Sequence, residues 1–104
     1  MGASAGLGLS VRPLTPALAS ELRVDPGTQG LVIVQVDPSS DAAAKGLSEG
    51  DIILSINQQA VRTAQEAVSL IAAARKAGRK QVLLLVKRGS VPPRFVGIEL
   101  SGKP

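Results

Sequence analysis

The sequence predicts an α+β fold with five or six strands, one main helix and two short helices. Short runs rich in Val, Ile and Leu recur between turn signals, which indicates strands. One longer stretch, at residues 64–76, has helical spacing of its apolar residues. Phe95 is the only aromatic residue, so small branched side chains must fill the core of a single 104-residue domain.

The first strand is expected over residues 7–14, where Leu7, Leu9 and Val11 alternate onto one face. Pro13, near the end of this strand, has no backbone N–H to donate. Proline is confined mainly to edge strands and strand ends. We therefore expect this strand to lie at an edge of the sheet.

Two short helices are predicted from their capping residues. Thr15 is a good N-cap and Pro16 suits the first helical position, so residues 16–23 should form the first of them. The second is a single turn in the alanine run before Gly46, and one of the two serines at 39–40 can cap it.

Four further apolar runs predict the remaining strands. Those at residues 30–37 and 80–89 are apolar on both faces, so we expect them to be central and buried. The other two alternate, with one apolar face each. Those faces are Ile52, Leu54 and Ile56 in one strand, and Val96, Ile98 and Leu100 in the other.

The main helix has both a start and a stop signal. Thr63 and Glu66 form a T-x-x-E capping box before it, and Gly78 follows its end. Its apolar residues form two adjacent stripes, which make a wide apolar face. The stripes are Ala67, Leu70 and Ala74, and Ala64, Val68, Ile71 and Arg75. One stripe can belong to the core while the other borders a binding surface.

Composition excludes most catalytic and metal chemistry. The sequence contains no His and no Cys, which removes the usual zinc, iron and copper ligands and every Ser-His or Cys-His nucleophile pair. Lys45 or Lys80 could in principle pair with a serine, but neither stands in an obvious cleft pattern. We expect no catalytic residue, no metal and no cofactor in this domain.

The charge pattern argues against two classes of partner. The net charge is +4, but no aromatic side chain lies among the clustered basic residues to stack on bases, so we expect no nucleic-acid binding. Cations in loops and at a helix C-terminus are ordinary solvated residues. No apolar run approaches the roughly 18 residues of a membrane span, and we expect neither a signal peptide nor membrane insertion.

The stretch GLGLS, residues 6–10, raises the question of a ligand. A dinucleotide loop needs G-x-G-x-x-G between a strand and a helix, whereas here a strand follows and Val11 occupies the third glycine position. Two alternatives remain. The glycines can be leader residues, or they can orient backbone N–H groups toward an anion such as a carboxylate, beside a strand that pairs with a peptide.

Residues 43–57 carry the signature A-x-x-G-L-x-x-G-D-x-I-L-x-I-N. Together with GLGL before a strand, this run resembles a PDZ domain from about Gly6 to Leu100. The early loop, the short helix after the first strand and the closing RFVGIEL resemble the second PDZ domain of bacterial HtrA/Deg-type periplasmic serine proteases. The sequence departs from that pattern at Ser39, Asp41 and Gln58, where Gly, Pro and Gly are usual.

The resemblance implies a partly open antiparallel barrel or sandwich, PDZ-like, over residues 6–101. Residues 1–5 would be a leader or a cloning remnant, and residues 102–104 a tail. In PDZ domains a peptide lies antiparallel between the first strand and the main helix. The matching residues here are Gly6, Leu7, Gly8, Leu9, Ser10 and Val11 in the loop and strand, and Ala64, Val68 and Ile71 in the helix wall.

Two details refine that implied site. Ala64 stands where some PDZ domains carry His, so the resemblance implies a preference for apolar C-terminal residues. For Val68 and Ile71 the alternative is ordinary core packing. Pro13 cannot donate a hydrogen bond to a ligand, so we expect the paired peptide segment to be about four residues long.

The resemblance also implies a biological setting. The domain would be a non-enzymatic, periplasmic module that binds apolar C-terminal or exposed peptide segments, within a serine protease of envelope protein quality control. One alternative is a structural domain that contacts neighbouring domains or subunits of that protease during assembly. Another is a PDZ domain of a site-2-type membrane protease.

Overall fold

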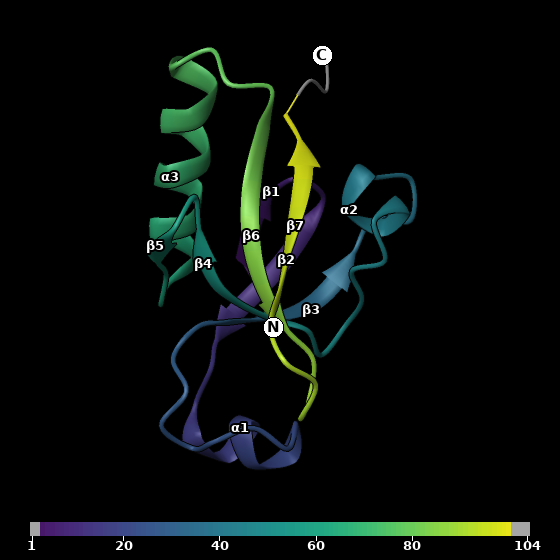
Figure 1. Ribbon diagram of the computed structural model, residues 1–104, viewed down its shortest axis with the longest axis vertical. Helices are drawn as coiled ribbons and strands as arrows, with labels where there is room; N and C mark the ends of the chain where they lie inside the picture. The colour runs from purple at the N-terminus through teal and green to yellow at the C-terminus, as the bar shows by residue number, and fades with distance from the viewer. Residues whose placement is uncertain (1–2, 101–104) are drawn as a thin grey trace.

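The structure is a computed structural model that describes residues 3–100 (Figure 1). One main helix and two short ones pack on an antiparallel sheet. The strands are β1 (Ala3–Gly6), β2 (Leu9–Pro13), β3 (Leu31–Val36), β4 (Ile52–Ile56), β5 (Gln59–Ala60), β6 (Gln81–Lys87) and β7 (Arg94–Glu99). The helices are α1 (Pro16–Glu21), α2 (Asp41–Ala44) and α3 (Ala64–Lys76).

The sheet is open and its strands run in the order β1-β2-β3-β4-β6-β7, every neighbouring pair antiparallel. The two-residue strand β5 adds a short hairpin to β4. Figure 1 shows α3 and α2 on opposite sides of β6 and β7, with α1 at the far end of the molecule. The predicted α+β class is confirmed, with six antiparallel strands on the main path and one dominant helix.

Helix α3 begins and ends where its local signals predict. The Thr63 hydroxyl accepts a hydrogen bond from the Glu66 N–H at 3.1 Å, which caps the helix. The Glu66 carboxylate accepts from the Arg62 N–H at 2.7 Å instead of closing the reciprocal box on Thr63. One orphan donor of the helix, the Glu66 N–H, is therefore satisfied, and the carboxylate of Glu66 binds one residue before the expected Thr63 N–H.

Helix α1 has the predicted Thr15 cap, whose hydroxyl accepts from the Leu18 N–H at 3.2 Å, but ends at Glu21. The predicted end at Arg23 is wrong because that residue adopts a φ of 63°, which breaks the helical repeat. The N-cap of α2 is Ser40, one of the two serines expected there.

A single irregularity in β4 divides the apolar side chains between two cores. The predicted common face holds for Ile52 and Leu54, which both pack in the second core, but is wrong for Ile56. The register of β4 against β6 shifts between Ile53 and Ser55, and such a bulge breaks the alternation of faces. Ile53 and Ile56 therefore enter the main core beneath α3, whereas Ile52 joins a second core.

The second core explains what α1 does. This core lies on the face of β3 and β4 that is opposite the main core, and α1 contributes to it. Strand β3, which was expected to be buried on both faces, is thus covered by the main core on one face and by the second core on the other. Only the first half of β3 is covered in this way, since Gln35 is exposed. The buried members of this core are Ala19, Val24, Val32 and Ile52.

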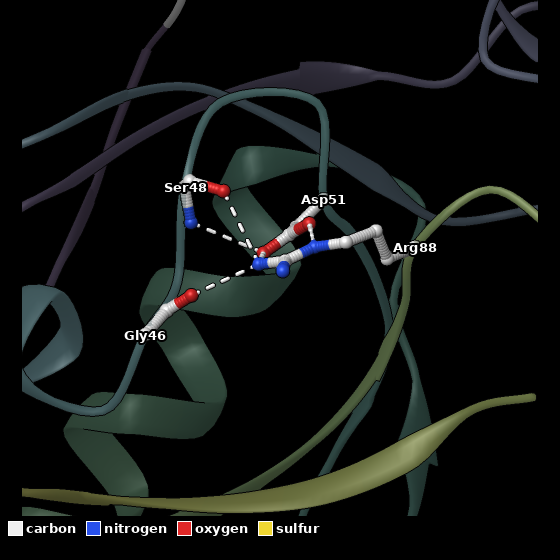
Figure 2. A network of polar contacts seen from close by, with 4 residues as sticks. All are labelled: Gly46, Ser48, Asp51 and Arg88. Atoms are coloured by element: carbon white, nitrogen blue, oxygen red, sulfur yellow. Dashed lines mark hydrogen bonds and ion pairs between the residues drawn. The ribbon is translucent and has the colours of Figure 1, made fainter. Parts of the chain in front are cut away.

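An ion pair between the buried Asp51 and the half-exposed Arg88 ties the loop after α2 to the end of β6 (Figure 2). Asp51 is 1% exposed, and Arg88 donates to both of its carboxylate oxygens, at 2.7 and 2.8 Å. The same guanidinium donates to the Gly46 carbonyl at 2.9 Å, and the Ser48 N–H donates to Asp51 at 3.1 Å. Hydrogen bonding and the negative charge of Asp51 raise the pKa of Arg88.

Side chains of Asp41 in α2 and of its C-cap residue Lys45 cover part of the outer edge of β7. Asp41 accepts from the Glu99 N–H at 3.0 Å, and Lys45 donates to the Gly97 carbonyl at 2.8 Å. Lys45 and Asp41 also pair with each other at 3.0 Å. The Glu99 N–H and then Lys45 lower the pKa of Asp41. Capping of this kind hides edge groups that could pair with another chain.

Asp41→Asn is expected to flatten the acid side of the stability profile. The folded-state pKa of Asp41 lies below the 3.8 of an ordinary aspartate, so its stabilisation is complete above that value and is lost as the pH falls through the folded pKa. The Tm gap between the parent chain and the variant should therefore shrink between about pH 6 and about pH 2. Thermal unfolding followed by circular dichroism measures it.

Glu49→Gln removes an exposed carboxylate from the neighbouring loop and serves as the matched control. A Tm gap for Asp41→Asn that stays constant over the whole pH range would contradict a role for the ionised carboxylate at the β7 edge.

Among the helices of the described segment, none combines the length and the hydropathy that crossing a membrane requires.

Candidate functional site

The GLGLS stretch forms a tight hairpin turn between β1 and β2. Leu7 and Gly8 are its two central residues, with φ values of 61° and 76°. Positive φ at both positions is the pattern of a type I′ turn, which usually holds Asn-Gly. A leucine in the left-handed conformation is strained by about 1 kcal/mol. The Leu7 conformation therefore destabilises the β1–β2 hairpin.

Close packing makes Gly8 obligatory in this turn. A Cβ atom at this position would lie 2.7 Å from the Cβ of Ser40. The Gly8 carbonyl also accepts a hydrogen bond from the Asp37 N–H at 2.8 Å. The loop is thus fixed against the N-terminus of α2, and the two glycines of the stretch have different reasons to be glycine.

Strand β2 is not an edge strand along its first half, so the predicted edge position is wrong there. β1 pairs antiparallel with residues Leu9 to Val11 of β2. Both strands contact α3, and β1 does so more extensively than β2. Among the described residues, the pairing extends as far as Ala3 opposite Val11. An unpaired row of N–H and C=O groups is satisfied by any chain segment that can reach it, and here a two-residue turn brings residues 3–6 within reach.

The predicted site residues divide between the core and the surface. Leu9, Val11 and Ile71 meet in the main core, where each is buried. Leu7 and Ala64 are half-buried and pack against that core. Two more of the predicted residues are further out, since Ser10 is half-buried in the sheet and Val68 is 44% exposed. Their roles as peptide contacts stay predictions.

A cavity of about 330 Å³ opens at the loop end of this region. Its lining includes Leu7 and Gly8 from the turn, Ser40 from the cap of α2, and Arg75 from the last turn of α3. Arg75 donates to the Leu100 carbonyl at 3.2 Å. The sequence signal for Arg75 was present, because it continues the stripe that contains Val68, but its position beside the loop depends on the fold.

Three larger hollows lie elsewhere, with volumes of about 380, 500 and 550 Å³. The first lies between the end of β3 and α2, the second along α3 beside β5, and the third at the start of β6. The linings of the two largest are mostly polar or charged, and a sequence without His or Cys offers them no conventional base. The region between β2, the turn and α3 is the better candidate because most of the predicted site residues gather there.

An open antiparallel sheet with a glycine-rich turn before its second strand and one helix along that strand is the arrangement of a PDZ domain. Residues 5–95 match the family model described as PDZ domain. The chain belongs to the PDZ domain family.

The curated relatives are bacterial proteases. A protein named "Probable periplasmic serine endoprotease DegP-like" from Brucella suis biovar 1 (strain 1330) is 44% identical over 73 residues, covering 70% of this chain and 14% of the relative. Its namesake from Chlamydia pneumoniae is 33% identical over 99 residues, covering 95% and 20%. This PDZ domain thus resembles those of HtrA/DegP-like periplasmic serine proteases, and the chain spans a fifth or less of these two relatives.

Solved structures agree with this placement. The PDZ domain of HtrA3 bound to the phage-derived ligand FGRWV superposes with a TM-score of 0.68 at 26% identity, covering 89% of this chain and 82% of that one. A variant of the HtrA-type protease AlgW with a decapeptide gives a TM-score of 0.74 at 28% identity, covering 94% and 29%. Both of these neighbours were solved with peptides.

Proposed function

We propose that this domain binds apolar C-terminal or exposed peptide segments by strand addition, as a module of a periplasmic serine protease of protein quality control. One observation carries the proposal: the outer edge of β2, beside α3, already holds an antiparallel strand, which is β1. A backbone edge that pairs with one extended segment can pair with another of the same direction. The peptide-bound PDZ neighbours support the same reading.

The energetics suit a weak, reversible interaction. Each net main-chain hydrogen bond to β2 contributes about 1 kcal/mol, and a buried apolar side chain about 1.5–3 kcal/mol. The cost of association offsets much of this gain, which leaves a Kd of roughly 10–100 μM. Such an affinity allows a protease to sample many unfolded segments and to release those that it does not cleave.

Catalysis is assigned to a part of the protease outside this domain. The sequence has no His or Cys to activate a nucleophile, whereas the relatives carry the name serine endoprotease and are at least five times longer than their match here. Those names favour a Deg-type parent over a site-2-type membrane protease. They also support a periplasmic location.

A second candidate function is domain–domain contact during assembly of the protease. Phe95 and Val91 favour it, because they are 57% and 55% exposed near the start of β7. Exposed apolar side chains of this size mark interaction surfaces when they gather in patches. Phe95→Ser should then weaken self-association in sedimentation experiments while leaving peptide affinity unchanged.

Val68→Asp is expected to weaken peptide binding about tenfold, because a charge replaces an apolar side chain on the helix beside β2. Fluorescence anisotropy with a labelled FGRWV pentapeptide and with a library of free C-terminal peptides measures the affinity. Val68 is 44% exposed, so the substitution should leave the fold intact.

Ser69→Asp is the matched control, since it adds the same charge to the adjacent exposed position of α3. A carboxamide version of each peptide tests whether the loop senses the terminal carboxylate. Equal loss of affinity in Ser69→Asp and Val68→Asp would contradict a specific role for the Val68 side of the helix.

A further inference from the structure

We propose that β1 is a built-in competitor, an internal strand that occupies the peptide site and must detach before a peptide can pair with β2. This inference rests on the proposed function and adds a means of regulation to it. It makes the domain autoinhibited, with peptide affinity set by how firmly the hairpin closes.

The first argument is geometric. β1 pairs with Leu9, Ser10 and Val11, which are the residues expected to receive a peptide. It runs antiparallel to β2 and reaches the GLGLS turn at its C-terminal end, as a bound peptide would reach the loop with its carboxylate. Because each backbone group on that side of β2 can pair with only one strand at a time, β1 and a peptide exclude each other.

The second argument concerns how strongly β1 is held. Its sequence is Ala-Ser-Ala-Gly, so it brings main-chain hydrogen bonds but no large apolar side chain. The pairing register shifts between Ser4 and Gly6, which interrupts the ladder. The turn that closes the hairpin places Leu7 at a φ of 61°, a conformation that L side chains disfavour. β1 is therefore a weak occupant held by its short tether.

The third argument is that β1 leaves apolar surface beside it unused. Val68 on α3 remains 44% exposed with β1 in place. A peptide with a large apolar C-terminal residue gains contacts that the residues of β1 are too small to make. Competition with β1 thus favours peptides with apolar C-terminal residues over peptides with polar ones, which bind too weakly to displace β1.

Competition with a tethered strand has a measurable consequence. The apparent Kd of a peptide equals its intrinsic Kd divided by the fraction of molecules with β1 detached. A variant lacking residues 1–5 has no competing strand, so its affinity for the labelled FGRWV pentapeptide should be about fivefold higher or more, if β1 is attached in about 80% of molecules. Ala3→Pro/Ala5→Pro in the full chain should raise affinity in the same direction, because proline disrupts strand pairing.

The opposite change tests the turn. Leu7→Asn creates the Asn-Gly pair that type I′ turns prefer, so the hairpin should close more firmly and peptide affinity should fall about threefold. Since Leu7 also lies in the proposed site, the same substitution is made in the variant lacking residues 1–5. There the loss should be smaller, because no β1 remains to compete and only direct contact of the Leu7 side chain can still contribute.

The outcomes separate the two proposals. Equal affinity of the full chain, the shortened chain and the double-proline variant would overturn autoinhibition while leaving peptide binding intact. An equally large loss for Leu7→Asn with and without residues 1–5 would also overturn it, since the whole effect would then arise from direct contact. Absence of binding to any library peptide by all variants, with folding verified by circular dichroism, would overturn the proposed function and the inference together.

Discussion

Arg88→Ala is expected to lower the free energy of unfolding by about 3 kcal/mol at neutral pH. The substitution removes the partner that neutralises Asp51, whose carboxylate is 1% exposed. A buried charge left without its partner is among the costliest single defects in a folded protein. The Arg88 side chain is 52% exposed, so water can reach part of the vacated space, and we place the effect at the lower end of the known range.

Urea denaturation followed by far-ultraviolet circular dichroism measures this loss as a lower midpoint at unchanged m-value. Arg79→Ala removes an exposed arginine at the other end of β6 and should change stability by less than about 0.5 kcal/mol. A double variant that also carries Asp51→Ala should recover part of the stability, because it no longer contains the buried charge. A loss below about 1 kcal/mol in Arg88→Ala would show that the pair is not a structural tie.

Gly8→Ala is expected to lower the free energy of unfolding by about 2–3 kcal/mol and to weaken peptide binding as well. The backbone φ of 76° is the first cause, since an L side chain is strained there by about 1 kcal/mol. The new Cβ would also stand 2.7 Å from the Cβ of Ser40. Ser40 caps α2 by accepting from the Ala43 N–H at 3.2 Å, so moving it weakens that cap too.

Gly6→Ala is the matched control for the steric effect. Gly6 has a similar φ of 83°, but nothing lies within 4 Å of the position that a Cβ would take. Its replacement should therefore cost only the conformational part, about 1 kcal/mol. Equal destabilisation by the two substitutions would contradict the close packing of the turn on α2.

Local signals in the sequence predicted the elements that depend on local physics. The capping residues Thr63 and Thr15 begin α3 and α1 where expected, and the signature around Asp51 indicates the PDZ family to which the chain belongs. A helix start is decided by hydrogen bonds within one turn. Such signals survive in almost any tertiary context.

The sequence-based predictions were wrong where the structure of a segment depends on contacts with residues distant in the sequence. The bulge in β4 moved Ile52 and Ile56 into different cores, and no pattern within the strand announces it, because register is set by pairing with β6. For the candidate site, alternation identified Leu9 and Val11 as inward-facing and helical spacing identified Ile71. Neither the alternation nor the helical spacing predicts that Leu9, Val11 and Ile71 share the main core while Val68 stays on the surface.

By itself the sequence determined the α+β class, the PDZ family, the absence of His and Cys chemistry, and the residues able to form a glycine-rich turn beside an apolar helix. Only the tertiary structure decided that residues 3–6 form a strand that pairs with the edge of β2. The reason is physical: composition and periodicity report what a segment can bury, whereas strand pairing depends on which backbone groups come within reach once the rest of the chain has folded.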